Sequence, residues 1–447
     1  MSSTVATKTS TGFKTTAGYG SLEVGVSAVE SFLRLYLLIY YTDRVGVDPK
    51  WAGLVVALGV LWDAVMDPIV GVLCDRTSTR FGRRLPWIMV SSPLFAISVF
   101  AAFAVPMGLS DSEKIVWLCL ANIAVNTSMA ALSIPHLALG SEISQQADVR
   151  TKLYAWRMLM SVVGLFVGVA VPAFIRTNFA SLDGLALTGF FSLDSLTALA
   201  FSGLIVLTSG ITLYVFLPKA RVQASAVTLK ADKASPPFKD VLSNLKRLPF
   251  VMLFVGYTVA TFGQGLNSSL ALYYYKYCLA FTEGQLQSTL LVFMLVLIVS
   301  LPLWVAASRR HSKSKLLAIG VLGLGLLTAT AYPLLPKYRL DLAMLVGGLG
   351  GLTLGCIALF ESHLTDMMAH YQFGEQSNAS VFGIWKFLAK SARAAAIALS
   401  GSLLSFIGYS ATAEVSIETS NQLAFIFGPV VGVFFILGGV ALWKSRI

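Results

Sequence analysis

Two aspartates inside an apolar run mark the stretch LWDAVMDPIVGVLCDRTSTRFGRRLPW, residues 61–87. Asp63 and Asp67 lie within an otherwise apolar segment that extends from Trp51 to Cys74. A charged side chain inside a membrane segment is energetically costly, so it is a functional hypothesis by default. Residues i and i+4 share one face of a helix, so both carboxylates point to the same place. Two acids at one place in a membrane helix indicate a cation or proton site.

Further charged residues lie in other apolar segments. Glu30 and Arg34 stand four residues apart in the first segment, and Arg157 lies in the fifth. Glu30 and Arg34 either form a buried ion pair that satisfies itself or line a central cavity. The arginine fork matches carboxylate, sulfate and phosphate groups. Two arginines in a cavity would therefore suit a substrate with an anionic group, such as a uronide.

Several other polar or aromatic residues are candidates for substrate contacts, each with a structural alternative. His136 follows Pro135 in the fourth segment, where it would sense or relay a proton, or form a hydrogen bond between helices. Gln264 and Asn267 belong to a polar cluster in the seventh segment, which either joins helices or contacts substrate. Trp385 in the eleventh segment would stack on a sugar ring or serve in packing.

The composition determines which class of protein must position these residues. Of 447 residues, 56% are hydrophobic and 12% are charged, and the mean hydropathy is +0.75. Soluble domains carry about 25% charged residues, so we expect a multi-pass membrane protein, in a bacterial inner membrane. Residues 1–20 are polar, which argues against a cleavable signal peptide. No GxxxxGKS motif, metal-type cysteine spacing or catalytic constellation occurs, so we expect neither an enzyme nor a bound metal or cofactor.

Twelve apolar segments of about 20 residues are long enough to cross a bilayer. Most lysines and arginines outside these segments fall on the side that includes both termini. This bias predicts cytoplasmic termini, and it accounts for the net charge of +11 without a nucleic-acid partner. The predicted spans are residues 19–42, 51–74, 86–107, 114–141, 152–175, 193–217, 249–275, 284–307, 315–335, 340–366, 379–408 and 421–443.

The longest polar stretch, residues 218–248, contains KADKASPPFKD and divides the predicted spans six and six. Twelve spans divided in this way are typical of the major facilitator superfamily. The predicted fold is all-α, and we expect a monomer with both termini in the cytoplasm. The predicted regions are a tail (1–18), an N-terminal six-helix bundle (19–217), a cytoplasmic central loop (218–248), a C-terminal six-helix bundle (249–443) and a short end (444–447).

The string DPIVGVLCDRTSTRFGRRLPW closely resembles the signature of the glycoside–pentoside–hexuronide:cation symporter family, a branch of that superfamily. The family pattern is D-P-x-x-G followed by D-R-T-x-S-R-x-G-(K/R)-x-x-P-W, and Thr79 stands here where serine is usual. Four further strings are similar to the family's helices one, four, ten and eleven: YLLIYYTDRVGV (36–47), SIPHLALGSEIS (133–144), LTDMMAHY (364–371) and SVFGIWKFLAK (380–390).

The resemblance implies a cation site. In this family two aspartates on helix two bind the coupling cation, and they fall on Asp63 and Asp67. A lysine on helix eleven falls on Lys390, which would neutralise the pair when the ion is absent; alternatively, the three residues only hold two helices together. Close like charges disfavour double ionisation, so the pair could carry a proton. Met66 and Ala130 offer no ligand oxygens to a hard cation, which favours protons over sodium.

The resemblance implies a different solute from that of the family's galactoside carriers. A sugar-binding aspartate on helix one falls on Ser27, a third carboxylate on helix four falls on Ser133, and an aromatic platform falls on Leu137. A cavity arginine on helix five falls on Arg157. Together with the residues named above, the candidate substrate-binding set is Ser27, Glu30, Arg34, Ser133, His136, Arg157, Gln264, Asn267 and Trp385.

The basic turn after the second span is a candidate cytoplasmic gate. In the superfamily such loops pair with acidic residues of neighbouring helices in the outward-facing state, and breaking those pairs opens the inner side. The alternative is simple anchoring by the positive-inside rule. Asp366, near the end of the tenth span, is a further gating or helix-end candidate. The residues of the turn are Asp75, Arg76, Arg80, Arg83 and Arg84.

These observations predict secondary active symport by alternating access of two six-helix halves. The expected partners are a small sugar-type solute such as a glycoside, pentoside or hexuronide, a coupling cation (H+ or Na+) and membrane lipids. Two alternatives remain. One is a cation-coupled transporter of lysolipids or other amphiphiles, and the other is a non-transporting sensor or assembly factor on the same fold.

Overall fold

The computed structural model describes residues 13–143, 147–179, 192–223, 247–371, 375–409 and 415–445, and the predicted tail and central loop lie largely outside them. The regular elements among the described residues are all helices, in agreement with the predicted fold class. The N-terminal helices are α1 (Phe13–Ile39), α2 (Pro49–Arg76), α3 (Leu85–Phe103), α4 (Asp111–Ile143), α5 (Ala147–Asn178) and α6 (Leu193–Gln223). The C-terminal helices are α8 (Leu248–Tyr273), α9 (Glu283–Ala307), α10 (Lys313–Thr330), α11 (Leu340–Leu354), α12 (Phe360–His370), α13 (Glu375–Phe406), α14 (Ile417–Phe425) and α15 (Val431–Lys444).

Eleven helical segments of the described residues are long and apolar enough to cross a membrane, and they coincide with predicted spans two to twelve. Helix α1 coincides with the first predicted span and has a similar length, but it carries Lys14, Glu23, Glu30 and Arg34. A membrane helix with several charged residues indicates a role for them, since each is costly in a lipid environment.

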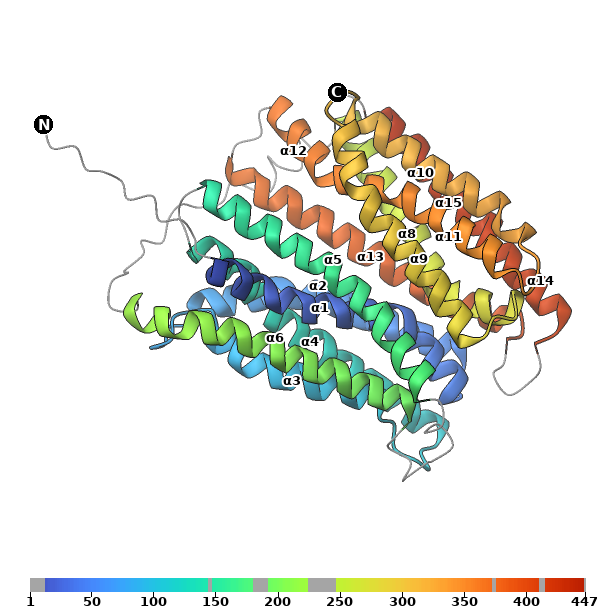
Figure 1. Ribbon diagram of the computed structural model, residues 1–447, viewed down its shortest axis with the longest axis horizontal. Helices are drawn as coiled ribbons and strands as arrows, with labels where there is room; N and C mark the ends of the chain where they lie inside the picture. Colours follow the sequence, from blue (N-terminus) through green and yellow to red (C-terminus); the bar gives the residue numbers. More distant parts are fainter. Residues whose placement is uncertain are drawn as a thin grey trace, which may run out of the picture.

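The helices form two groups, the N-terminal half (α1–α6) and the C-terminal half (α8–α15), which lie side by side along the length of the molecule (Figure 1). Within the N-terminal half, α1 packs on α5 and α6, and α4 packs on α2 and α3. Within the C-terminal half, α15 packs on α8 and α10, and α9 packs on α11. The two halves meet along α2 and α13, α5 and α9, and α1 and α8. Any residue on these facing surfaces can couple the halves.

The first helix of each half ends in a π-helical turn. Helix α1 continues into η1 (Tyr40–Arg44), and α8 continues into η3 (Tyr274–Cys278). Both turns lie at the end of the bundle away from the start of α1 and the end of α15 (Figure 1). We call this the outer end, because the chain termini are predicted to be cytoplasmic. Short 3-10 and π segments also interrupt the tenth and twelfth spans, at η5 (Gly355–Leu359) and at η6 (Ile426–Val430), which contains Pro429.

Glycines allow α2 and α13 to approach closely near the outer end. A Cβ atom placed on Gly401 would lie 2.3 Å from the carbonyl oxygen of Pro49 and 2.9 Å from the Cα atom of Gly53. No side chain can occupy that space, because each of these distances is shorter than a van der Waals contact. The two halves are therefore in backbone contact at this point, which only glycine permits.

Candidate functional site

The two aspartates of α2 meet a lysine of α13 between the halves. The Nζ atom of Lys390 lies 2.8 Å from Oδ2 of Asp63 and also bonds Oδ2 of Asp67. The Asp63 carboxylate is buried, whereas the Asp67 and Lys390 side chains are 27% and 21% exposed. Helical spacing places the two carboxylates on one face of α2, as predicted, and the lysine from the other half bridges them.

A second ion-pair group continues from this site towards α1. Glu30 accepts from Arg34 at 2.7 Å and from Arg393 of α13 at 3.1 Å. Arg393 also acts electrostatically on Asp63, so the two groups form one unit. We call it the central cluster, and it consists of Glu30, Arg34, Asp63, Asp67, Lys390 and Arg393. It holds equal numbers of acidic and basic residues.

The sequence left open whether Glu30 and Arg34 pair with each other or line a cavity, and the structure shows features of both. They form an ion pair, yet their side chains are 37% and 32% exposed. Both side chains are therefore only partly covered by other parts of the protein. The Nε atom of Arg34 has no hydrogen-bond partner among the described residues.

Arg157 lies in a third group, inside the N-terminal half. Its Nη1 atom donates to Oε2 of Glu23 at 3.0 Å, and Nδ1 of His136 lies 3.6 Å from the same carboxylate oxygen. Ser27 shares a 2.8 Å hydrogen bond with Ser161 of α5 and lies 3.5 Å from Glu23. We call Glu23, His136 and Arg157 the N-terminal cluster. Sequence reasoning had singled out His136 and Arg157 but not the acid between them.

Trp385 belongs to an aromatic group that borders the central cluster. Its ring stacks on Phe360 with centroids 5.3 Å apart, and it meets the edge of Tyr257 at 5.5 Å. Tyr257 is close enough to Arg34 to interact with it electrostatically. The indole is buried, so in this conformation it packs against other aromatic rings. The aromatic group of α8, α12 and α13 thus adjoins the central cluster through Tyr257 and Arg34.

The other predicted substrate residues are less closely connected. Gln264 lines a small cavity of apolar walls between α8, α10, α11 and α15. Asn267 is half-buried one turn further along α8. The Ser133 hydroxyl donates to the Met129 carbonyl of its own helix at 2.7 Å. Among the described residues, none of these three forms a hydrogen bond with a member of the central cluster.

Sequence analysis did not find the polar contacts at the outer end. Asp43 of η1 accepts from Lys276 at 2.5 Å, from Tyr277 at 2.6 Å and from Tyr409 at 2.5 Å, all from the C-terminal half. Burial and the neighbouring Asp43 raise the pKa of Tyr409 above the ordinary range, so its phenol stays protonated and donates. Beside this group, the hydroxyls of Thr42 and Tyr273 lie 2.6 Å apart.

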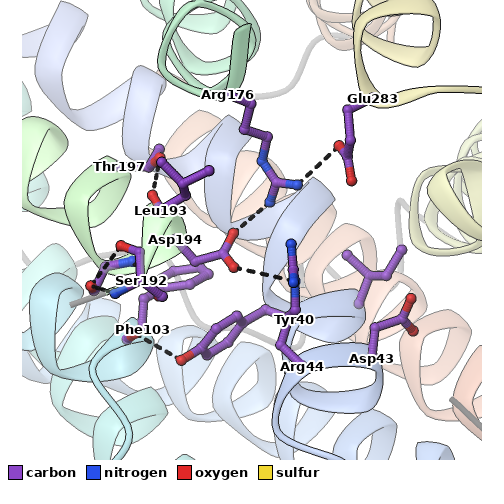
Figure 2. A network of polar contacts seen from close by, with 12 residues as sticks. Tyr40, Asp43, Arg44, Phe103, Arg176, Ser192, Leu193, Asp194, Thr197 and Glu283 are labelled. Carbon is purple, nitrogen blue, oxygen red and sulfur yellow. Dashed lines mark hydrogen bonds and ion pairs between the residues drawn. The ribbon is translucent and has the colours of Figure 1, made fainter. Parts of the chain in front are cut away.

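A second branch of outer-end contacts is centred on Arg176, at the end of α5. Figure 2 shows its guanidinium between Asp194 of the same half and Glu283 of the other, at 2.5 and 2.9 Å. Arg44 lies 3.8 Å from the opposite side of Asp194. We call the outer-end residues the outer cluster: Asp43, Arg176, Asp194, Lys276, Tyr277, Glu283 and Tyr409. Most of these residues lie at the ends of predicted spans, where charged and aromatic residues are common in membrane proteins. The sequence pattern therefore did not single them out.

The predicted cytoplasmic gate forms a compact turn. The Thr79 hydroxyl donates to the Gly82 carbonyl at 2.8 Å, and Gly82 has a φ of +83° that favours glycine. Arg80 stacks on the ring of Phe81 at 4.8 Å. The Nη1 atom of Arg84 lies 3.1 Å from Sγ of Cys74.

Among the described residues, three of the basic gate candidates do not join the halves at that end. Arg76, Arg80 and Arg83 form no ion pair with another described residue, and the Asp75 side chain lies outside the described part. Asp366 of α12 pairs with Lys313 of α10 at 2.6 Å, within one half. Ion pairs between the halves are therefore found in the central and outer clusters, which corresponds to a conformation closed at the outer end.

The described residues hold no group of three or more histidine, cysteine or acidic side chains placed to bind a metal ion. The four cysteines are free, and three of them are buried.

Comparison with known proteins agrees with this arrangement. The chain is 24% identical to the sodium-dependent lysophosphatidylcholine symporter 1 of Gallus gallus, over 92% of this chain and 82% of that protein. It is 26% identical to the isoprimeverose transporter of Lactiplantibacillus pentosus, over 93% and 85% of the two chains.

Solved structures share the fold at low sequence identity. A bacterial homologue of the human lysosomal transporter Spinster, in an inward-facing and unoccupied conformation, superposes with a TM-score of 0.65 at 14% identity, over 98% of this chain and 99% of that one. A bacterial homologue of the human peptide transporters PepT1 and PepT2 gives 0.66 at 12% identity, over 97% of each chain.

The family assignment rests on the match of residues 18–447 to the family described as MFS/sugar transport protein. The resemblance noted in the span-two motif is thereby confirmed, as are the multi-pass membrane character and the assignment as a transporter rather than an enzyme. With its two helical halves and the charged residues between them, the chain belongs to the MFS/sugar transport protein family.

Proposed function

We propose that the protein is a cation-coupled symporter whose coupling site is formed by Asp63 and Asp67. The observation that carries this proposal is the bridge from Lys390 to both carboxylates, which joins α2 of one half to α13 of the other. The ammonium occupies the position where a coupling cation would neutralise the pair. A cation and Lys390 therefore compete for the same two carboxylates.

This competition links the cation to movement of the halves. When a cation binds, Lys390 loses its partners and the contact between α2 and α13 weakens. A ligand shifts a conformational equilibrium by its differential affinity for the two states. The cation would therefore favour the state in which α2 and α13 separate, and the effect on solute binding is reciprocal. The absence of ion pairs for Arg76, Arg80 and Arg83 among the described residues supports an inner side that is open here.

We propose the proton as the coupling ion. Hard metal cations are bound through several oxygen ligands. Among the described residues, Asp63 and Asp67 make their polar side-chain contacts with Lys390, and the neighbouring Met66 supplies no oxygen. A proton needs a single carboxylate oxygen, and two close carboxylates favour its uptake.

For the solute, we propose a sugar with an anionic group, such as a hexuronide. Arg34 and Arg393 share the single carboxylate of Glu30, and within the described part of the chain the Nε atom of Arg34 has no acceptor. Neutralisation of Asp63 or Asp67 by a cation leaves the balanced central cluster with an excess positive charge. An anionic group on the solute would restore the balance, so cation and solute favour each other's binding. The aromatic rings of Tyr257 and Trp385 border the same place and suit the apolar face of a sugar.

Uptake into proteoliposomes tests this proposal. The panel contains methyl β-D-glucuronide, methyl β-D-glucoside, methyl β-D-xyloside and isoprimeverose, each with an inward proton gradient, an inward sodium gradient or no gradient. We expect accumulation of the glucuronide driven by the proton gradient. Accumulation driven only by sodium would overturn the choice of ion. Uptake of none of the solutes would contradict sugar symport and favour the sensor alternative.

Lysolipid transport is a second candidate, favoured by a specific feature of the C-terminal half. The small cavity between α8, α10, α11 and α15 has apolar walls and reaches Tyr257 and Phe360, next to the charged cluster. An amphiphile could place its headgroup at the arginines and its chain towards this cavity. Lysophosphatidylcholine is therefore a fifth member of the panel, and its uptake without that of any sugar would decide for this candidate.

A further inference from the structure

The N-terminal cluster contains a buried histidine with a defined environment. His136 of α4 is 1% exposed, and its ring lies 4.8 Å from that of Tyr19 on α1. Its Nε2 atom is 2.7 Å from the backbone carbonyl oxygen of Tyr19. Because a carbonyl oxygen only accepts, Nε2 must carry a hydrogen. The protonation state of His136 therefore depends on Nδ1 alone.

The Nδ1 atom faces a carboxylate. It lies 3.6 Å from Oε2 of Glu23, somewhat beyond hydrogen-bond distance. With Nε2 protonated, the neutral ring directs a lone pair towards this negative oxygen, which is unfavourable. A second proton on the ring turns Nδ1 into a charged donor, and a small movement then closes a strong hydrogen bond to Glu23.

The charged groups around His136 come from two of the helices that pack on α4. Glu23 belongs to α1 and Arg157 to α5. From α2 and α3, no charged side chain of the described residues bonds the imidazole, and the hydroxyl of Tyr19 is directed to the Leu137 carbonyl instead. With a neutral imidazole the cluster is balanced, and one proton gives it a single positive charge.

Arg157 has unused hydrogen-bonding capacity. Its Nη1 atom donates to Glu23, but its Nε atom is buried without a hydrogen-bond partner among the described residues. The side chain is 25% exposed, so a small ligand can reach it. When a protonated His136 competes for Glu23, the guanidinium regains donors that match a carboxylate.

We infer that His136 and Glu23 form a proton-binding site separate from Asp63 and Asp67, and that its protonation releases Arg157 to bind an anionic group of the solute. The proton site itself is independent of the proposed function, whereas the role of Arg157 rests on it. The N-terminal cluster lies within one half, so it alters the charge of the solute site without contributing an ion pair between the halves.

Nitrogen NMR of the full-length protein with 15N-labelled histidine tests the proton site. The chain has four histidines, and single substitutions assign their ring signals. We expect a doubly protonated His136 ring to be detectable in the unmodified protein. Glu23→Gln should reduce the doubly protonated fraction at a given pH, because loss of a nearby opposite charge favours the neutral ring. A ring that is singly protonated at every pH measured, or a doubly protonated fraction unchanged by Glu23→Gln, would overturn the site.

Binding of methyl β-D-glucuronide tests the second step. We expect the affinity of the protein for this glucuronide to increase about tenfold from pH 8 to pH 6. The reason is that one additional positive charge in the N-terminal cluster attracts the anionic group, and a tenfold change corresponds to one pKa unit. His136→Gln, which keeps a donor for the Tyr19 carbonyl, should abolish this increase, and Arg157→Gln should weaken binding at pH 6. His370→Gln, an exposed change on α12, is the control.

The outcomes separate this inference from the proposed function. A pH dependence that survives His136→Gln but disappears in Asp63→Asn would overturn the inference and leave proton symport intact. If no variant binds the glucuronide, the proposed solute is wrong and so is the role of Arg157, whereas the NMR titration still decides the proton site.

Discussion

The central cluster and the outer cluster contain the same kinds of residue but differ in their proposed roles. Both join the two halves through carboxylates, and both include a lysine of the C-terminal half. In the outer cluster the Asp43 side chain is 7% exposed and is surrounded by tyrosine hydroxyls. In the central cluster the Glu30 side chain is 37% exposed. The three donors from the other half hold the buried Asp43 carboxylate as a lock, although Lys276 and Glu283 of the outer cluster are 40% and 50% exposed. The exposed Glu30 carboxylate can instead exchange a partner for a ligand.

The backbone near each cluster strengthens this contrast. Close to the outer cluster, Gly53 and Gly401 bring α2 and α13 into backbone contact. Around Lys390 the same two helices are joined by side chains, which can rotate when a cation arrives. The comparison predicts that changes in the central cluster alter the response to cations, and that changes in the outer cluster alter the population of the closed state.

Lys390→Gln should give the largest effect. Without the competing ammonium, the cation concentration for half-maximal uptake should fall roughly 10- to 100-fold, the equivalent of one to two pKa units. Uptake measured as a function of pH and of sodium concentration checks this. Lys386→Gln is the control, since that side chain is exposed on the same helix. An unchanged cation dependence would mean that Lys390 holds the helices together without competing for the site.

Gly401→Val should open the outer end. The new side chain overlaps the Pro49 carbonyl, and overpacking costs roughly 1–3 kcal/mol, so the closed state should lose about 10- to 100-fold in population. Cys278 is a native probe, because its buried thiol donates to the Ser420 carbonyl in this region. We expect faster labelling of Cys278 by N-ethylmaleimide, measured by mass spectrometry. Gly203→Val, at a position with open space around it, should label like the unmodified protein.

Asp43→Asn should have a smaller effect on the same probe. The substitution removes the charge of the acceptor in the three hydrogen bonds from the C-terminal half and keeps the size of the side chain. A hydrogen bond to a charged group contributes about 1.5–3 kcal/mol. Labelling of Cys278 should accelerate about tenfold, with no change in the cation dependence of uptake. Asp341→Asn is the matched control, because its pair with Arg339 is exposed and such pairs contribute little. Equal acceleration in both variants would contradict a specific lock.

Tyr409→Phe should give the smallest effect, about a three- to tenfold faster labelling, because it removes one donor to Asp43 and leaves those of Lys276 and Tyr277 in place. The raised pKa of Tyr409 sets its pH dependence. A phenol whose pKa is raised on folding stabilises the folded state fully below the ordinary value of about 10 and loses this contribution as pH rises through the raised value. The ratio of the Cys278 labelling rate in Tyr409→Phe to that in the unmodified protein should therefore stay constant from pH 7 to pH 9.

Much of the architecture could be predicted from sequence because hydropathy is local. The apolar segments indicated the spans, and helical spacing indicated that Asp63 and Asp67 share a face. The meeting of Lys390 with them followed from the family resemblance, since no local pattern connects residues that far apart. Orientation in the membrane and the roles of the site residues stay predictions.

The missed residues share a physical cause. Glu23 has no basic residue one helical turn away in its own sequence, and its contacts with His136 and Arg157 depend on how α1, α4 and α5 pack. Arg176 and Asp43 lie at span ends, where charged residues are ordinary. Their pairing across the halves depends on the closed conformation, which composition and periodicity do not determine.

The central claim is that Asp63 is part of the coupling site, and one pair of assays on Asp63→Asn tests it most directly. In proteoliposomes, gradient-driven accumulation of methyl β-D-glucuronide is compared with its exchange between equal concentrations on the two sides. We predict loss of accumulation with exchange retained, because the neutral side chain no longer gains or loses a cation in each cycle. Accumulation equal to that of the unmodified protein would contradict the assignment of Asp63 and, with it, this account of coupling.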